Sequence, residues 1–201
     1  MSAAGNLART GAAFAATCAL TIAVAAQEPT PDPAAWRPLA YADLRVPSPT
    51  TQTYADIWKD ALEANNQAYV ARGDRRFGGG NAPATEAHFV IWSARRSVVL
   101  TILNTATGCV LRMVDAPARV SVKLCPLRVA AYEGVEVRTL DGGRACFLEV
   151  TASASVAAPE ISRAGAYASY EPATRLIRLG LVIDHRPVDG CSLTIPIPPR
   201  S

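Results

Sequence analysis

Only two histidines in the chain, His88 and His185, are available as a general base at neutral pH. A serine or threonine nucleophile would therefore have to be activated by one of these two imidazoles. The sequence contains no G-x-S-x-G elbow, the local pattern that presents the serine nucleophile in many hydrolases. Because triads are defined by geometry and not by spacing, a Ser-His-Asp arrangement assembled from distant positions stays open at this point.

The most specific motif in the sequence is Asp184-His185-Arg186-Pro187-Val188-Asp189-Gly190. It resembles the D-H-R-x-x-D-G signature of the dihydrolipoamide acyltransferase and chloramphenicol acetyltransferase superfamily. The resemblance implies that His185 is the base that deprotonates a thiol or hydroxyl nucleophile and that Asp189 holds the local structure. Those domains are intracellular, use coenzyme A or lipoyl carriers and continue into a helix, whereas here a strand-like segment ends the chain. We therefore favour a polar hairpin loop in which Asp189-Gly190 makes the turn.

Neither a metal nor a cofactor is expected. With two histidines and cysteines that we expect to be oxidised, a transition-metal site would need clustered carboxylates. Acidic residues such as Glu133, Asp141 and Glu149 are scattered along the chain, as solvated charges usually are. The glycine run Gly78-Gly79-Gly80 lacks the lysine and the spacing of a phosphate-binding loop.

The cysteines indicate an exported protein. Four of them, Cys109, Cys125, Cys146 and Cys191, follow the N-terminal segment, and none forms a C-x-x-C pair. An even number of cysteines in an exported chain indicates structural disulfides. Two disulfides are therefore expected.

Four cysteines allow three pairings, and strand geometry favours one of them. Strands over 109–114 and 119–125 form a hairpin that brings Cys109 within one residue of Cys125, and a bulge near Pro126 would place the two opposite each other. Cys146 and Cys191 begin strands of similar pattern and both point inward by alternation. We expect the disulfides Cys109–Cys125 and Cys146–Cys191.

The N-terminal segment has the pattern of a secretory signal. One basic residue, Arg9, precedes an apolar run that ends in small residues, which predicts cleavage before Ala26 or Gln27. The run is too short for a typical spanning helix and is followed by prolines, so no membrane span is expected after cleavage. Cys18 allows a lipoprotein interpretation, but the apolar residues that continue after it argue against acylation. We expect a bacterial periplasmic or secreted protein.

Three regions follow from the composition: a removable signal at residues 1–26, a proline-rich extended leader at 27–50 and one β-rich domain at 51–201. The prolines of the leader exclude a regular helix or a central strand there. Its second half lies on the domain surface, or else Trp36 and Tyr41 are free to bind a partner.

One helix and eight strands are predicted in the domain. Thr53 opens an amphipathic helix that ends near Ala71, with Asp56 in the capping-box position. From residue 87 the apolar period becomes two, which predicts antiparallel strands and a β-sandwich or partly open β-barrel. The strands fall near residues 87–92, 97–103, 109–114, 119–125, 135–140, 145–153, 175–183 and 191–197. Residues 155–172 are predicted as an irregular connection that carries Tyr167 and Tyr170, which we take as possible partner-binding residues.

Composition limits the function classes. Half of the 201 residues are hydrophobic, 18% are charged and the formal net charge is +3, so the sequence offers no electrostatic case for nucleic acid. No complete catalytic constellation is present. We therefore expect a non-catalytic accessory protein, subunit or binding module whose partner is another protein of the cell envelope or the extracellular space.

Two alternatives stay open. One is a secreted hydrolase or acyltransferase-like enzyme centred on His185, which requires this histidine to lie in a pocket within reach of a nucleophile. The other is a protein inhibitor that presents a disulfide-braced loop over residues 155–172.

Overall fold

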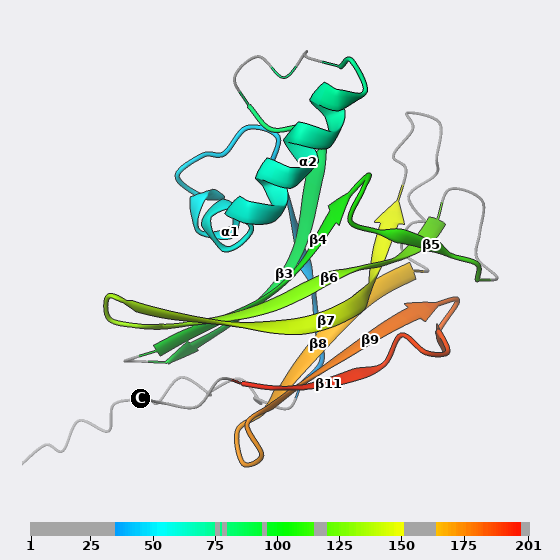
Figure 1. Cartoon of the computed structure of the whole chain (residues 1–201). Coiled ribbons are helices and arrows are strands. Elements are labelled where there is room, and N and C mark those ends of the chain that lie inside the picture. Colours follow the sequence, from blue (N-terminus) through cyan, green and yellow to red (C-terminus); the bar gives the residue numbers. More distant parts are fainter. Residues whose placement is uncertain are drawn as a thin grey trace, which may run out of the picture. The chain divides into compact units, whose positions relative to one another are not determined.

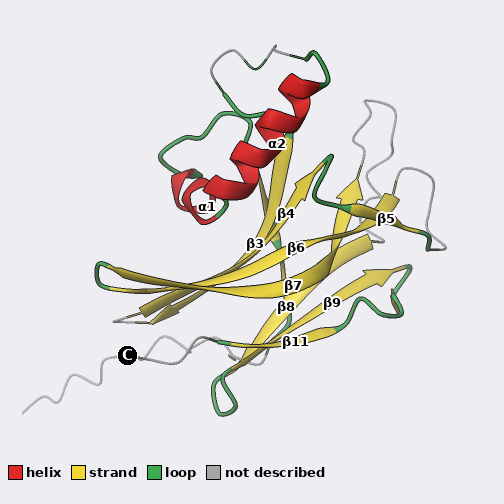
Figure 2. Ribbon diagram, viewed as in Figure 1, coloured by secondary structure: helices red, strands yellow, loops and turns green. Residues whose placement is uncertain are grey.

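The computed structural model describes residues 35–74, 77, 80–93, 96–114, 120–150 and 164–197. All of them belong to the unit Pro31–Ser201, and the predicted signal segment lies outside the described residues. They form two helices and two antiparallel sheets (Figure 2). The prediction of a mainly β protein with two disulfides is confirmed.

Figure 1 labels most of the elements along the chain. In chain order they are β1 (Arg37–Pro38), β2 (Ala40–Asp43), α1 (Gln52–Ile57), α2 (Lys59–Ala71), β3 (Ala84–Ser93), β4 (Arg96–Thr105), β5 (Val110–Arg112), β6 (Val120–Glu133), β7 (Glu136–Val150), β8 (Ala164–Glu171), β9 (Leu176–Ile183), β10 (Arg186–Pro187) and β11 (Leu193–Pro196).

The larger sheet has the order β2-β3-β4-β6, with β5 and β7 also paired to β6. The smaller sheet has the order β1-β8-β9-β10, with β11 also paired to β9. The leader joins the two sheets, because β1 pairs with β8 and β2 pairs with β3. Between them, the buried Leu39 donates its backbone N–H to the carbonyl oxygen of Ala166 at 2.9 Å. The second half of the leader therefore lies at the edges of both sheets.

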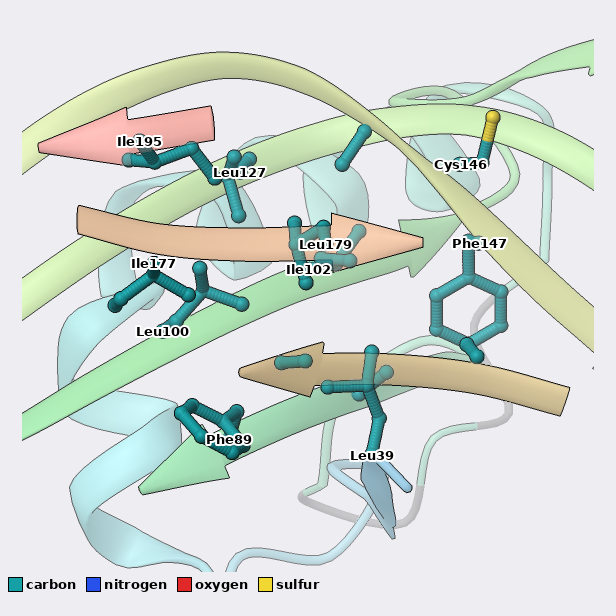
Figure 3. Packing of buried hydrophobic residues seen from close by; sticks show 14 of the residues in the cluster. Leu39, Phe89, Leu100, Ile102, Leu127, Cys146, Phe147, Ile177, Leu179 and Ile195 are labelled. Carbon is teal, nitrogen blue, oxygen red and sulfur yellow. The ribbon is translucent and has the colours of Figure 1, made fainter. Parts of the chain in front are cut away.

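The central part of the larger sheet is buried on both faces. Alternate residues of β4 point to opposite sides: Leu100 and Ile102 join the core shared with the smaller sheet, and Val99 and Leu103 join a second core under the helices. Figure 1 shows the helices on one side of this sheet and β8, β9 and β11 on the other. Figure 3 shows the apolar side chains of both sheets meeting in the first core.

The predicted helix is interrupted. Trp58, with φ −106° and ψ 13°, separates α1 from α2, and Thr51 rather than Thr53 precedes the first turn without a side-chain capping bond. The indole of Trp58 is 1% exposed and donates to Thr101 Oγ1 of β4 at 3.1 Å. The backbone hydrogen bonds Trp58 N–H to Tyr54 and Leu62 N–H to Trp58, at 3.2 and 2.8 Å, keep the two helices in sequence across this break.

The strands predicted near 135–140 and 145–153 are not separate, because β7 runs without interruption from Glu136 to Val150. Residues 151–153 lie outside the described residues. Both halves pair with the same long strand β6, and the register shifts between Pro126 and Arg128. Gly143, with φ +77°, lies opposite this shift. Gly142 and Gly143 therefore accommodate an irregularity within one strand and do not form a turn.

The connection predicted at 155–172 is wrong from residue 164 onward. Residues 164–171 form β8, paired antiparallel with β9, and Tyr167 and Tyr170 lie on this strand. Alanine, glycine and serine make up much of β8, and their low β propensity hides the strand from sequence analysis. Residues 155–163 lie outside the described residues.

The two disulfides have the predicted pairing. Cys109 and Cys125 have Cα atoms 4.4 Å apart, and the β5–β6 register of Val110 with Leu124 sets them directly opposite each other. No bulge is needed in this ladder, because the irregularity at Pro126 affects the β6–β7 pairing. Cys146 of β7 bonds to Cys191, just before β11, so the second disulfide joins the two sheets.

Candidate functional site

His185 lies at the tip of a tight hairpin. Ile183 of β9 pairs with Arg186 of β10, and the two residues between them, Asp184 and His185, have φ of 50° and 63°. Two consecutive positive φ values are the mark of a type I′ turn. The hairpin turn therefore falls at Asp184-His185, and it leaves His185 exposed. The predicted turn at Asp189-Gly190 is also present, since Cys191 donates its backbone N–H to the carbonyl oxygen of Val188 at 3.1 Å and Gly190 has φ +68°. It does not close a hairpin, because β10 and β11 both pair with β9.

A hollow of about 760 Å³ lies beside this turn, and His185 is not among the residues that line it. Arg112 closes one side by donating from Nη2 to the carbonyl oxygen of Asp189 at 2.8 Å. The remaining lining residues carry no hydroxyl or thiol group; they are Met113, Val114, Ile183, Asp184, Arg186, Pro187 and Val188. This hollow therefore does not join His185 to a serine, threonine or cysteine, as the enzyme interpretation would require.

His88 has a structural partner instead. Its Nδ1 lies 2.6 Å from Oε1 of Glu86, whose side chain has no solvent exposure. Thr101 Oγ1 donates to the other carboxylate oxygen at 2.6 Å, and the ring of Tyr54 stacks on the imidazole at 4.2 Å. A buried carboxylate is tolerated when such partners satisfy it. This polar network fixes α1 over the larger sheet.

Arg128 of β6 contacts the chain where α1 ends and α2 begins. Its Nη1 donates to the carbonyl oxygen of Ile57 at 2.7 Å, and its guanidinium lies 4.5 Å from the centre of the Trp58 ring. Both terminal nitrogens bond to Asp60 at 2.6 and 2.7 Å. These hydrogen bonds lower the pKa of Asp60 to about 2.

The candidate functional site is a groove at the end of the core between the sheets. Its cavity volume is about 1030 Å³. The residues that line it come from the leader, β3, β4, β7 and β8; they are Pro38, Leu39, Tyr41, Arg45, Thr85, Asn104, Phe147, Leu148, Glu149, Ala164, Gly165, Ala166 and Tyr167. Leu39 and Phe147 also belong to the main core (Figure 3). The groove is therefore where the core opens to solvent.

Aromatic side chains form one wall of the groove. Tyr41 meets Phe147 edge to face, with ring centres 5.6 Å apart, and burial of its hydroxyl raises the pKa of Tyr41 to about 12. The ring of Tyr167 lies over Gly165, where an added Cβ would come within 2.6 Å of it. Glycine at this position thus leaves room for the tyrosine ring.

Two of the four aromatic residues predicted to bind a partner, Tyr41 and Tyr167, line this groove. The other two do not. Trp36 is 53% exposed and covers Gly180 on β9, and Tyr170 is partly buried against the main core.

Polar groups form the rim of the groove. Lys123 pairs with Glu149 at 2.8 Å, and Asn104 and Ser121 each donate to the same carboxylate at 3.1 Å. Burial raises the pKa of Glu149, but these hydrogen bonds together hold it below its ordinary value. Arg45 bonds to Asp43 at 2.7 Å on the other side of the rim. The sequence does not predict that Lys123 and Glu149 belong to a site. Their only signal is a charge within an otherwise apolar strand.

Comparison with family models, with curated proteins and with solved structures finds no match for the chain. Within the described residues, no group of three or more potential ligands among histidine, cysteine, aspartate and glutamate could hold a metal ion. In the same part of the chain, no helix is long and apolar enough to cross a membrane.

Proposed function

We propose that the chain is an exported, non-catalytic binding module, acting as an accessory protein or subunit of a bacterial periplasmic or secreted system. The observation that carries the proposal is the groove between the sheets, in which Tyr41 and Tyr167 face a hollow of about 1030 Å³. A concave site with aromatic walls and a few polar groups is the usual form of a binding site.

The lining indicates a segment of a partner protein as the occupant. Tyrosine presents a large, rigid apolar surface together with one polar end, which is why it is common at protein interfaces. Two charged side chains line the groove, Arg45 and Glu149, and each is paired with an opposite charge, Asp43 and Lys123 respectively. Such a rim suits the mixed polar groups of a polypeptide better than the uniform negative charge of a nucleic acid.

Export is supported by the two disulfides, since disulfides persist in oxidising compartments. The fold of the proposed module is an open β-sandwich. What favours a sandwich over a barrel is that, among the described residues, no strand of one sheet pairs with a strand of the other.

A library of linear peptides displayed on phage, selected on the immobilised exported protein, tests the proposal. We expect enriched peptides whose affinity falls at least about tenfold in Tyr41→Ala and in Tyr167→Ala, because aromatic anchors dominate interface energies. Trp92→Ala is the matched control, since Trp92 is 78% exposed and lies outside the groove.

His185→Ala separates binding from catalysis. The proposal expects this variant to bind the selected peptides as the wild type does, because His185 is exposed on a turn away from the groove lining. Peptides that bind the Tyr41→Ala/Tyr167→Ala double variant at full affinity would refute the groove as the site. A hydrolytic or acyl-transfer activity that His185→Ala abolishes would replace the proposal with an enzyme.

A further inference from the structure

The first half of β7 is an exposed sheet edge. Residues 136–141 pair with β6 on one side, and no described strand pairs with them on the other. All six residues are exposed, with Val137 at 53% and Leu140 at 38%. Figure 1 shows the β6–β7 hairpin reaching past the helices. An uncovered edge of this kind presents free backbone donors and acceptors to another strand.

The turn determines which backbone groups face outward. Glu133 and Glu136 close a two-residue loop whose first residue, Gly134, has φ +63°, as a type II′ turn requires. The closing pair of such a hairpin exchanges its own hydrogen bonds, and the pattern alternates along the ladder. The N–H and C=O groups of Val137 and Thr139 therefore point away from β6.

The side chains of this edge are self-complementary. Glu136 and Arg138 lie two residues apart and so share one face of the strand. Neither forms an ion pair with another described residue. A two-fold axis through Val137, perpendicular to the sheet, sets Glu136 of each copy opposite Arg138 of the other. Like charges that repel a second edge are the usual protection of an exposed strand, whereas this arrangement attracts a second copy.

On one face of the larger sheet, a row of cross-strand neighbours ends at Val137, the residue on the two-fold axis. Val137 pairs across the larger sheet with Tyr132, which pairs with Ser97, which pairs with the exposed Trp92. Residues directly opposite each other in antiparallel strands share a face. Val137 would meet Val137 of the second copy, and both valines would leave water.

We propose that two copies of the chain associate edge to edge through antiparallel pairing of β7 about Val137, with two Glu136–Arg138 ion pairs across the axis. The contact is isologous, as in most two-fold dimers. One short pair of strands is smaller than a standard stable interface, so a dissociation constant on the order of 10 μM or weaker is expected. The surface is separate from the groove, and the inference does not rest on the proposed function.

Sedimentation velocity of the exported protein, from about 1 μM to about 500 μM, tests the inference through charge reversal. Glu136→Arg and Arg138→Glu each replace two attractions by two repulsions, so each should weaken dimerisation at least about tenfold. The double variant Glu136→Arg/Arg138→Glu restores opposite charges and should dimerise as the wild type does. Near-ultraviolet circular dichroism confirms that the three variants keep the native fold.

Three outcomes overturn the inference. The first is a wild-type protein that stays monomeric at every concentration tested. The same result is expected if another segment of the chain covers the edge of β7. The second is dimerisation that neither single reversal weakens. The third is a double variant no stronger than the single variants, because a non-specific effect of charge would not be rescued.

Discussion

Glu86 shows at the scale of one residue why this fold carries a buried charge. Its carboxylate has no solvent exposure and bonds to His88 and Thr101, while Thr101 also accepts from Trp58. Removing one member of such a network leaves the others buried without a partner. His88, one of the two histidines that could act as a base, is held in this network by its bond to Glu86.

Glu86→Gln should therefore destabilise the protein by about 1 to 2 kcal/mol, because an amide replaces charge-assisted hydrogen bonds to its neighbours by weaker neutral ones. Urea unfolding measures the change. Glu63→Gln, an exposed glutamate on α2, is the matched control and should stay within about 0.5 kcal/mol of the wild type. An equal effect of the two substitutions would show that the network contributes nothing.

Asp60 makes the stability of the folded protein depend on pH, and its lowered pKa determines the sign of that dependence. Hydrogen bonds from Arg128 lower the folded-state pKa from 3.8 to about 2, so the pairing stabilises the protein above pH 4 and is lost as the pH falls from about 4 to about 2. Because the Asp60 side chain is 70% exposed, the contribution is below about 1 kcal/mol. Asp60→Asn should flatten the stability curve in this window. A slope equal to that of the wild type in urea titrations at pH 4 and pH 2 would contradict the assignment.

At the scale of the elements, alternation predicted the strands that face a core, and tertiary contacts decided the rest. β3, β4 and β9 lie within a few residues of their predicted positions, because each is a run rich in apolar residues and β4 is buried almost throughout. The break at Trp58 lies where Arg128 of β6 bonds to the carbonyl oxygen of Ile57, and β7 is continuous along the long partner β6. Local sequence shows neither contact. The disulfide pairing was predictable because hairpin geometry restricts which cysteines can meet.

The two disulfides should contribute unequally. Cys109 and Cys125 are 16 residues apart, whereas Cys146 and Cys191 are 45 apart. In the chain-entropy model the longer loop contributes about 4 kcal/mol and the shorter about 3 kcal/mol. Paired Cys→Ala variants measured by urea unfolding should keep this order. The reverse order would show that loop entropy does not decide their contributions.

At the scale of the whole described structure, the two sheets are joined in three ways. The leader pairs with both sheets, the Cys146–Cys191 disulfide joins them, and the main core fills the space between. Where that core ends, residues from the leader, β7 and β8 form the groove. The sequence predicted Tyr41 and Tyr167 as binding residues but could not place them together, because the strands that carry them belong to different sheets.

Heteronuclear NMR titration of the exported protein with a selected peptide tests the central claim most directly. The account predicts that the largest shifts in amide resonances fall at residues 39–41, 147–149 and 164–167, which line the groove from three separate strands. Largest shifts at residues 183–189, around His185, with the groove resonances unchanged, would contradict it.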